Sequence, residues 1–389
     1  MQKIARWIEE KKIAQIIFWI AYSIELAIML IDKSALTNPW EGRLFQVTFG
    51  LFVIKILLTK YEKREWVAIA LFTILGVVSY YYTDRNTILR IVAFVVAGKG
   101  VDIKKLIKYT FWVTLAAVIA LMLLSATGVL GWNYVEAEFD GRGPQGVIRR
   151  YCFGLGHPNA FQCMLMALIL LYVYSYWEKI NIVRIIVIMA LNVGFFLFTK
   201  SRTGVVVISV VVILLILVKW KKESLSSALM RYLMIGSVVL FNIYSVVAAK
   251  FGWSLSIIEF FDRFVTDRFG VAAAIGGVDT WSLFSRVSNA EYFDAGFIRV
   301  AYWYGIVPYA IYVVVLCALL LFCLKERDDK ACIIVFSLAL YTLFEAHIVS
   351  VYMARDYILL ILMLYWPCMC TGFNNLLLRK RADATRQEA

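Results

Sequence analysis

The segment Arg149–Asn159 brings together side chains that can bind anions and transfer protons. Arg149 and Arg150 carry guanidinium groups, which bind phosphate or carboxylate through paired N–H donors. His157 is one of only two histidines in the chain, and a neutral imidazole beside these arginines could orient a hydroxyl. A simpler interpretation stays open for the run that ends at Asn159, because proline in a first turn and a histidine or asparagine cap are typical of a helix start.

Three further residues supply carboxylate or imidazole groups near the ends of apolar stretches. Asp294 directly precedes one of these stretches, and Glu345 and His347 lie near the end of another. A carboxylate in the position of Asp294 could accept a proton from an attacking hydroxyl, or it could cap the helix that follows. Ionisable groups in such stretches usually face the protein interior, which makes a function the default hypothesis for Glu345 and His347.

Arg202 lies in a connection so short that its guanidinium is held at the end of an apolar stretch. There it could extend to lipid headgroups or bind the diphosphate of a lipid-linked substrate. It belongs to a group of arginines in alternate connections, whereas lysines predominate in the other connections. The group is Arg43, Arg85, Arg90, Arg142, Arg149, Arg150, Arg202, Arg263, Arg268, Arg286, Arg299 and Arg355. The sequence leaves open which of them pair with acidic groups and which bind phosphate.

The composition places all of these residues in a membrane protein. The chain has 389 residues, of which 62% are hydrophobic and 17% charged, whereas soluble domains have about 25% charged residues. Apolar stretches of about 20 residues alternate with short charged connections, and backbone groups in lipid must be satisfied within each stretch, which predicts helices. The net charge of +13 resides in the connections and does not indicate a nucleic-acid partner. We therefore expect an all-α polytopic membrane protein that forms a single transmembrane domain over residues 1–389.

The apolar stretches predict about twelve transmembrane helices. Their approximate limits are 13–31, 44–59, 66–82, 87–98, 108–130, 158–177, 182–199, 203–219, 229–249, 295–324, 331–348 and 357–374. With both termini in the cytoplasm, the lysine-rich connections lie inside and the arginine-rich ones outside, which agrees with the positive charge that cytoplasmic loops carry. The arginines and the acid–base candidates then share the outer face of the plasma membrane.

Three outer connections are longer than simple turns. Residues 131–157 form the first, and Glu345–Asp356 forms the last. Residues 250–294 form the longest, and within it Leu255–Phe269 groups apolar side chains on one side, a pattern typical of a helix in the membrane interface. The glycine-rich Gly270–Gly277 that follows is expected to be a flexible connection.

Several chemistries have no signal in the sequence. The seven cysteines show no disulfide or metal-ligand spacing and are expected to be packing residues. Clusters of Asp, Glu and His with metal-ligand spacing are missing, as are a phosphate-binding loop and a dinucleotide fingerprint. We therefore expect a chain that uses no metal and no cofactor.

Short motifs in a fixed order resemble those of the O-antigen ligase and polymerase superfamily, with the Wzy-type polysaccharide polymerases as the most similar branch. The motifs are Gly-His-Pro-Asn-x-Phe at 156–161, Ser-Arg-Thr-Gly at 201–204, Val265-Thr266-Asp267-Arg268, the segment from Asp294 to Gly305, and Phe344-Glu345-Ala346-His347. The ligase branch has a histidine at the position of Asp294, and the asparagine that often follows it is Ala295 here.

The resemblance implies a fold of the GT-C type with a long extracytoplasmic loop. It also implies a metal-independent membrane glycosyltransferase of the plasma membrane. Such an enzyme joins undecaprenyl-diphosphate-linked oligosaccharide repeat units into a capsular or O-antigen type polysaccharide of the cell envelope. The expected partners are this lipid-linked oligosaccharide, the lipid bilayer, a flippase and a chain-length regulator.

The same resemblance suggests roles for the candidate residues. The expected diphosphate-binding residues are Arg202, Arg268, Arg150 and Arg149, and the expected substrate contacts are Asn159 and Arg299. The expected acid–base residues are Asp294 or His157 as the base, with Glu345 and His347 in support. Charge neutralisation is the main electrostatic help that a departing diphosphate needs.

Two other functions are compatible with the sequence. One fits it about as well as polymerisation, and the other fits it less well. A ligase of the same superfamily, which would hand finished polymer to a new acceptor, is hard to distinguish from a polymerase by sequence. A flippase or exporter of lipid-linked oligosaccharide would need a basic cavity open to both faces of the membrane. The predicted clustering of arginines on one side disfavours transport.

Overall fold

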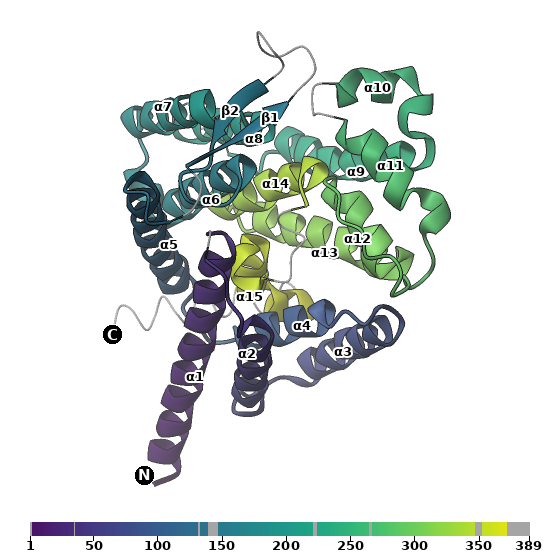
Figure 1. Cartoon of the computed structure of the whole chain (residues 1–389). Helices are drawn as coiled ribbons and strands as arrows, with labels where there is room; N and C mark the ends of the chain where they lie inside the picture. Colours follow the sequence, from purple (N-terminus) through teal and green to yellow (C-terminus); the bar gives the residue numbers. More distant parts are fainter. Residues whose placement is uncertain are drawn as a thin grey trace.

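The computed structural model describes residues 2–34, 36–130, 133–138, 147–220, 224–263, 267–346 and 352–371, which form a helix bundle with one hairpin (Figure 1). The helices are α1 Gln2–Asp32, α2 Glu41–Leu57, α3 Lys63–Thr83, α4 Thr87–Ala97, α5 Ile103–Ala126, α6 Pro158–Ser175, α7 Ile182–Thr199, α8 Arg202–Leu215, α9 Ala228–Phe251, α10 Ser256–Asp262, α11 Arg268–Gly276, α12 Gly296–Tyr304, α13 Ile306–Lys325, α14 Asp329–Phe344 and α15 Tyr357–Thr371. The hairpin pairs β1 (Tyr134–Glu138) with antiparallel β2 (Val147–Tyr151). A short 3-10 helix, η5 (Met353–Arg355), precedes α15.

Eight helices in the described part of the chain are long and apolar enough to cross a membrane. They cover Lys12–Asp32, Lys63–Thr83, Ile103–Ala126, Pro158–Ser175, Ile182–Thr199, Arg202–Trp220, Ala228–Ser254 and Ile306–Lys325. The helices α2, α4, α14 and α15 are shorter. The predicted class, an all-α membrane protein, is confirmed at this level, and the count of about twelve spans stays a prediction.

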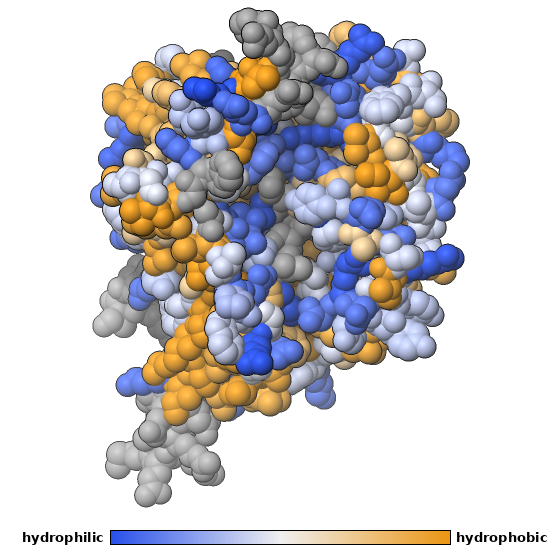
Figure 2. Space-filling view, in the orientation of Figure 1, coloured by the Kyte–Doolittle hydropathy of each residue, from blue (hydrophilic) through white to orange (hydrophobic). Residues whose placement is uncertain are grey.

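Helix α6 lies at the centre of the bundle. In α6, 89% of an apolar 18-residue stretch is buried, compared with 17% in α3 and 22% in α7. Apolar helices with so little buried surface would be costly in water, so we infer that α3 and α7 face lipid. Figure 2 shows hydrophobic surface over the lower part of α1 and α2, whereas hydrophilic residues gather toward the centre and the hairpin. The candidate residues at the start of α6 are therefore surrounded by other helices.

The prediction of a single helix over 295–324 is wrong, because the chain forms α12 and α13 with a break at Gly305. Gly305 has a φ of +99°, which is the left-handed region that glycine adopts readily. The segment 282–285 reaches this break and makes backbone hydrogen bonds of 2.9 to 3.1 Å with residues on both sides of it. A loop thus satisfies the polar groups that the break leaves open.

The prediction of one interfacial helix over Leu255–Phe269 is also wrong, because α10 and α11 replace it. The glycine-rich segment that follows is helical rather than flexible. In α11, Gly270 packs so closely on the Trp253 ring that an added Cβ would lie 1.8 Å from a ring atom. Helix α10 does expose Ile257 and Phe260, as expected of a helix in the membrane interface.

Contacts between helix ends divide the molecule into two ends. The lysine end comprises the connections α2–α3, α4–α5, α6–α7, α8–α9 and α13–α14. The arginine end comprises the connections α1–α2, α3–α4, α5–α6, α7–α8, α9–α12 and α14–α15. At the lysine end, Lys55 donates to the carbonyl of Lys99 at 2.9 Å and Lys99 pairs with Glu65. At the arginine end, Arg85 donates to the carbonyl of Asn289 at 2.7 Å. Which end faces the cytoplasm stays a prediction.

Most contacts of the two bases with aromatic rings also lie at different ends, although Lys33 lies over the Tyr352 ring at the arginine end. Lysine–aromatic contacts at the lysine end are Lys99–Tyr61, Lys108–Tyr176, Lys219–Trp177 and Lys330–Tyr174. Arginine–aromatic contacts at the arginine end are Arg43–Trp40, Arg85–Trp303 and Arg149–Tyr134. The separation of lysines from arginines in the sequence is therefore a separation in space.

The break between α12 and α13 gives a test of stability. In Gly305→Ala, the new Cβ would lie 2.6 Å from Cα of Phe284 and 2.7 Å from the carbonyl oxygen of Leu283. Strain of this kind costs about 1–3 kcal/mol, so we expect the purified protein in detergent to unfold at a lower temperature. The control is Gly236→Ala in α9, which has nothing within 4 Å and should leave the midpoint unchanged or raise it. Equal midpoints for the two variants would contradict the tight packing at the break.

Candidate active site at the arginine end

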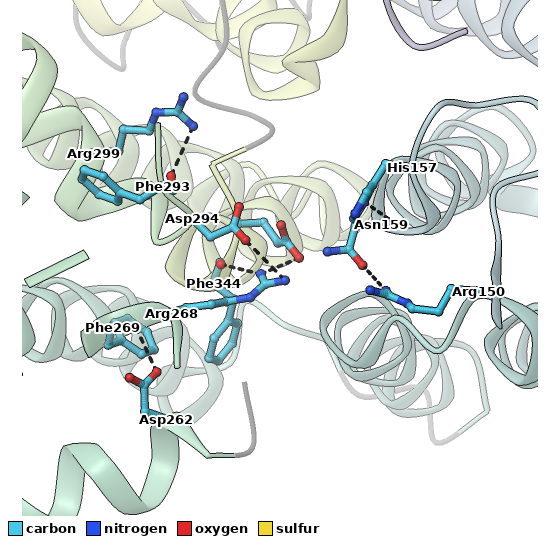
Figure 3. A network of polar contacts seen from close by, with 11 residues as sticks. Arg150, His157, Asn159, Asp262, Arg268, Phe269, Phe293, Asp294, Arg299 and Phe344 are labelled. Atoms are coloured by element: carbon cyan, nitrogen blue, oxygen red, sulfur yellow. Dashed lines mark hydrogen bonds and ion pairs between the residues drawn. The ribbon is translucent and has the colours of Figure 1, made fainter. Parts of the chain in front are cut away.

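Arg268 is the centre of the candidate site. Its side chain is only 9% exposed, and its Nη1 donates to the carbonyl oxygen of Phe344 at 2.7 Å and lies 2.5 Å from Oε1 of Glu345. Its Nη2 lies 3.5 Å from Oδ2 of Asp294 (Figure 3). Glu345 is 1% exposed and Asp294 is 30% exposed. One carboxylate is therefore buried against the guanidinium, and the other remains accessible.

Burial and neighbouring charges have opposite effects on the pKa values of Glu345 and Arg268. Burial raises the pKa of Glu345 to about 7, although the charge of Arg268 opposes the rise. Burial also works against the charge of Arg268, but the carboxylates of Glu345 and Asp294 outweigh it and raise the guanidinium pKa. The guanidinium therefore keeps its charge, while Glu345 can exchange a proton near neutral pH.

Close packing of α12 on α14 brings the two carboxylates together. A Cβ added to Gly296 would lie 2.7 Å from the carbonyl oxygen of Thr342 and 2.9 Å from that of Glu345, so only glycine fits here. The alternative role of Asp294 as a helix cap is wrong, because Ala295 occupies the N-cap position of α12. Ala295 has a φ of +68°, which turns the chain so that Asp294 faces Arg268.

A buried carboxylate anchors the first turn of α11 and with it Arg268. Asp262 is 0% exposed and accepts hydrogen bonds from the backbone N–H groups of Phe269 and Gly270 at 2.8 and 2.7 Å. It also accepts a hydrogen bond from Nε1 of Trp253 at 2.9 Å. Helix N-terminal amides have no partners within the helix, so Asp262 fixes the position of this turn.

A second group of polar side chains lies on the other side of the site. Nη2 of Arg150 donates to Oδ1 of Asn159 at 2.7 Å, and Nε of Arg150 donates to the carbonyl oxygen of Thr199 at 2.9 Å. Arg150 thereby joins strand β2, the start of α6 and the end of α7. Both Arg150 and Asn159 are buried, at 8% and 9% exposure.

His157 caps α6, as the simpler interpretation of the sequence predicted. Its Nδ1 accepts the backbone N–H of Asn159 at 3.2 Å. Burial and the charge of Arg150 lower the pKa of His157, which favours the neutral imidazole. If Nδ1 accepts, the proton of the neutral ring lies on Nε2, which is then a donor rather than a base. His157 therefore suits hydrogen bonding to an oxygen better than proton abstraction.

The two groups face each other across the site. In Figure 3, Arg150, Asn159 and His157 lie on one side and Arg268 and Asp294 on the other. The charge of Asp294 raises the pKa of His157 and that of Arg268 lowers it, although burial and Arg150 have larger effects. The site thus combines two buried guanidinium groups, an accessible carboxylate and an imidazole.

Comparison of the chain with protein-family models, with curated proteins and with solved structures finds no match. The resemblance to the O-antigen ligase and polymerase superfamily therefore rests on its motifs and stays a prediction. The spatial grouping is a separate observation, because four of the five motifs contribute a side chain to one cluster: His157 and Asn159, Arg268, Asp294, and Glu345.

Two predicted diphosphate-binding arginines lie beside the site rather than in it. Strand alternation turns Arg149 to the exposed face of β2, where its Nε pairs with Glu136 at 2.9 Å. Arg202 is the first residue of α8 and is exposed. It follows the turn at Thr199 that Arg150 contacts. Arg149 is thus directed away from the cluster, and Arg202 lies at its margin.

Arg299 is 0% exposed, so its predicted contact with the substrate stays a prediction. Its guanidinium lies 3.3 Å from the centre of the Tyr292 ring and 3.8 Å from that of Trp303. It also donates to the carbonyl oxygen of Phe293 at 3.3 Å (Figure 3). Arg299 therefore holds the segment before α12 in place. His347 lies outside the described residues.

Sequence reasoning missed Asp262 and Gly296, which position the site from behind. Asp262 stands in an apolar stretch among exposed charged residues, and nothing in its local pattern distinguishes it from a surface aspartate. A signal for Gly296 was present in the run Asp294-Ala295-Gly296, since glycine beside a proposed catalytic residue often marks close backbone packing.

We expect Asp262→Ala to loosen the first turn of α11. The change leaves two buried backbone amides and the Trp253 indole without an acceptor, at a cost of about 1–3 kcal/mol. Hydrogen exchange of the peptide that contains Phe269 and Gly270 should become faster. Glu259→Ala is the control, because the pair that Glu259 forms with Arg263 is exposed. Unchanged exchange in Asp262→Ala would show that packing alone holds this turn.

The raised pKa of Glu345 makes stability depend on pH. Because the folded-state value of about 7 exceeds the usual value of 4.5, the stabilising contribution is full below pH 4.5 and is lost as pH rises through 7. The loss is at most about 3 kcal/mol. We expect Glu345→Gln to reduce the fall in unfolding free energy between pH 5 and pH 8.

The pH dependence of the wild type alone does not isolate Glu345, so the variants must be compared with the wild type. Burial also raises the pKa of Asp356 to about 7, so Asp356 adds a dependence of the same sign. Asp356→Asn should therefore remove a separate part of the fall. If Glu345→Gln has the same pH dependence as the wild type, Glu345 does not titrate in this range.

Proposed function

We propose that this chain is a membrane glycosyltransferase that polymerises lipid-diphosphate-linked oligosaccharide repeat units into a surface polysaccharide. The observation that carries the proposal is the clamped Arg268, which faces Arg150, Asn159 and His157 at the arginine end of the bundle. Guanidinium groups suit a diphosphate leaving group, and an accessible carboxylate beside them suits a hydroxyl nucleophile.

In the proposed reaction, the growing chain is held by its diphosphate and a hydroxyl of the next unit attacks the anomeric carbon. A new C–O bond forms as the bond from that carbon to the diphosphate oxygen breaks, and the electron pair leaves with the diphosphate. Asp294 is the base of choice, because it is the more exposed carboxylate and its Oδ atoms can take the hydroxyl proton. His157 would donate from Nε2 to a substrate oxygen.

Arg268 already has two negatively charged neighbours, Asp294 and Glu345. Two carboxylates offset one guanidinium, so an incoming diphosphate would be repelled if both stayed ionised. Burial has raised the pKa of Glu345 to about 7, and a nearby diphosphate would raise it further. Proton uptake by Glu345 would then free Arg268 to bind the diphosphate together with Arg150. Arg202, exposed at the start of α8, would contact the same group from the margin of the site.

The finer architecture belongs to this proposal. The four shorter helices α2, α4, α14 and α15 would complete about twelve spans, in a body of the GT-C type. Both termini would lie in the cytoplasm, and the arginine end would face outward with the long connection between α9 and α12. Undecaprenyl diphosphate is the expected carrier, and a flippase would supply the repeat units.

Arg268→Ala should abolish long polymer while single repeat units still accumulate on lipid. Loss of one preorganised charge at a transition state costs about a hundredfold to a thousandfold in rate. The assay is reconstitution with a synthetic lipid-diphosphate repeat unit, followed by a gel of the products. Arg263→Ala is the matched control, because Arg263 belongs to the same connection but is exposed and pairs with Glu259.

Normal polymer lengths in Arg268→Ala would remove the assignment. Polymer moved to a new acceptor by the wild type would indicate a ligase instead. Unchanged sugars on the other leaflet would indicate a flippase. Asp294→Asn separates the two halves of the mechanism, since it should lose polymerisation but keep binding of the lipid diphosphate.

A further inference from the structure

Lys33 and Arg355 bring two positive charges to one small cavity outside the cluster described above. Lys33 follows the end of α1, and Arg355 ends η5. The two side chains line a cavity of about 10 Å³ together with Ala160, Cys163 and Tyr357. A cavity of this size holds about one water-sized group.

Arg355 is buried without a full set of partners. The residue is 7% exposed, and among the residues that the structure describes no hydrogen-bond partner is found for its Nη2. A buried donor without a partner costs about 1–3 kcal/mol, more when the group is charged. An oxygen atom bound in the cavity would supply an acceptor for this donor and remove the cost.

The charge around the cavity favours an anion over water. Burial and the charge of Arg355 lower the pKa of Lys33, and its neighbour Asp32 opposes this. Asp32 is shared, because it also accepts a hydrogen bond from the hydroxyl of Tyr352 at 2.6 Å. Asp356 follows Arg355 in the chain, and burial raises its pKa to about 7, which weakens its charge at neutral pH. The ammonium of Lys33 pairs with Oδ2 of Asp32, whereas no ion pair is found for Arg355 within the described part of the chain. Two cations and one paired carboxylate therefore leave net positive charge at the cavity.

The cavity lies beside the helix whose first residues form one half of the candidate active site. Helix α6 begins at Pro158, and its residues Ala160 and Cys163 line the cavity. At a rise of about 1.5 Å per residue, these positions lie roughly 5 to 9 Å along the helix from His157. The charge of Arg355 also lowers the pKa of Glu345, though less than Arg268 does. A ligand held by Arg268 and Arg150 would have to span about this distance along α6 to contact Lys33 and Arg355.

We propose that Lys33 and Arg355 form a second anion site, which takes one oxygen of the phosphate farther from the sugar in a lipid-linked diphosphate. The site rests on the proposed function, in which Arg268 and Arg150 hold the phosphate next to the sugar. The cavity admits a single oxygen, so the rest of that phosphate lies outside it. The arrangement makes the protein selective for diphosphate carriers over monophosphate carriers.

The test measures binding to the full-length protein in detergent, by titration calorimetry with polyprenyl diphosphate, polyprenyl monophosphate and inorganic pyrophosphate. We expect Arg355→Gln to weaken binding of the diphosphate lipid at least tenfold and to change binding of the monophosphate lipid by less than twofold. Lys33→Gln should act in the same direction, and Arg355→Lys should recover part of the loss. Arg263→Gln is the matched control at the same end of the molecule.

The outcomes distinguish this inference from the proposed function. Equal losses for both lipids in Arg355→Gln, or no loss for either, overturn the second anion site. If Arg355→Gln does not fold, Lys33→Gln answers the same question. If the wild type binds pyrophosphate but no polyprenyl diphosphate, and Arg355→Gln loses the pyrophosphate, Lys33 and Arg355 still form an anion site. Its assignment to a lipid-linked diphosphate and the proposed polymerase function are then both overturned.

Discussion

The buried guanidinium of Arg268 between two carboxylates is the interaction on which the arginine end depends. A charge at 9% exposure is tolerable only when it is paired and hydrogen-bonded. Three segments far apart in the chain must therefore converge on it: the start of α11, the residue before α12 and the residue after α14. Asp262 fixes the first of these, and Gly296 lets the other two approach. Such precise convergence is expensive to maintain and is typical of sites that act on a ligand.

The separation of lysines and arginines gives this cluster its setting. Either base satisfies the rule that places positive charge on the cytoplasmic side, so topology alone does not explain why arginine predominates at one end. A planar guanidinium holds its charge when buried, as Arg150 and Arg268 are, and can donate to several acceptors at once. Lysine is a point charge that loses its proton more readily on burial. The arginine end is therefore the end built to hold charge away from water.

Most of the helices could be predicted from the sequence, and most of their interruptions could not. Apolar stretches report helices directly, because lipid demands internal hydrogen bonding. The break at Gly305 escaped prediction because its cause is the distant segment 282–285, which supplies the missing backbone partners. The long connection was read as one interfacial helix with a flexible end because Asp262 looked like a surface residue. Its burial depends on α11 folding back toward Trp253, which no local pattern encodes.

The candidate site, like the fold, could be predicted only in part from the sequence. Residue types and positions pointed to Arg150, His157, Asp294 and Glu345, and the family resemblance added Arg268. The structure brings these five residues to one end. Residue types and positions were not enough to separate Arg149 from Arg150, although strand alternation would have done so had the hairpin been recognised. The stacking of Arg299 between aromatic rings could not be predicted, because such an arginine looks the same in sequence as one that binds a ligand.

Two carboxylates around one guanidinium can serve different purposes because their surroundings differ. Glu345 is enclosed, and burial raises its pKa to about 7, so it can give up its charge when an anion approaches Arg268. Asp294 keeps solvent contact at 30% exposure, so it is the carboxylate that a molecule from outside can contact. In the proposed reaction, one carboxylate would adjust the charge of the site while the other would take the proton of the hydroxyl. Because Nδ1 of His157 accepts a hydrogen bond from the backbone of α6, the imidazole would not compete with Asp294 for that proton. The proposed choice of base thus follows from packing rather than from residue type.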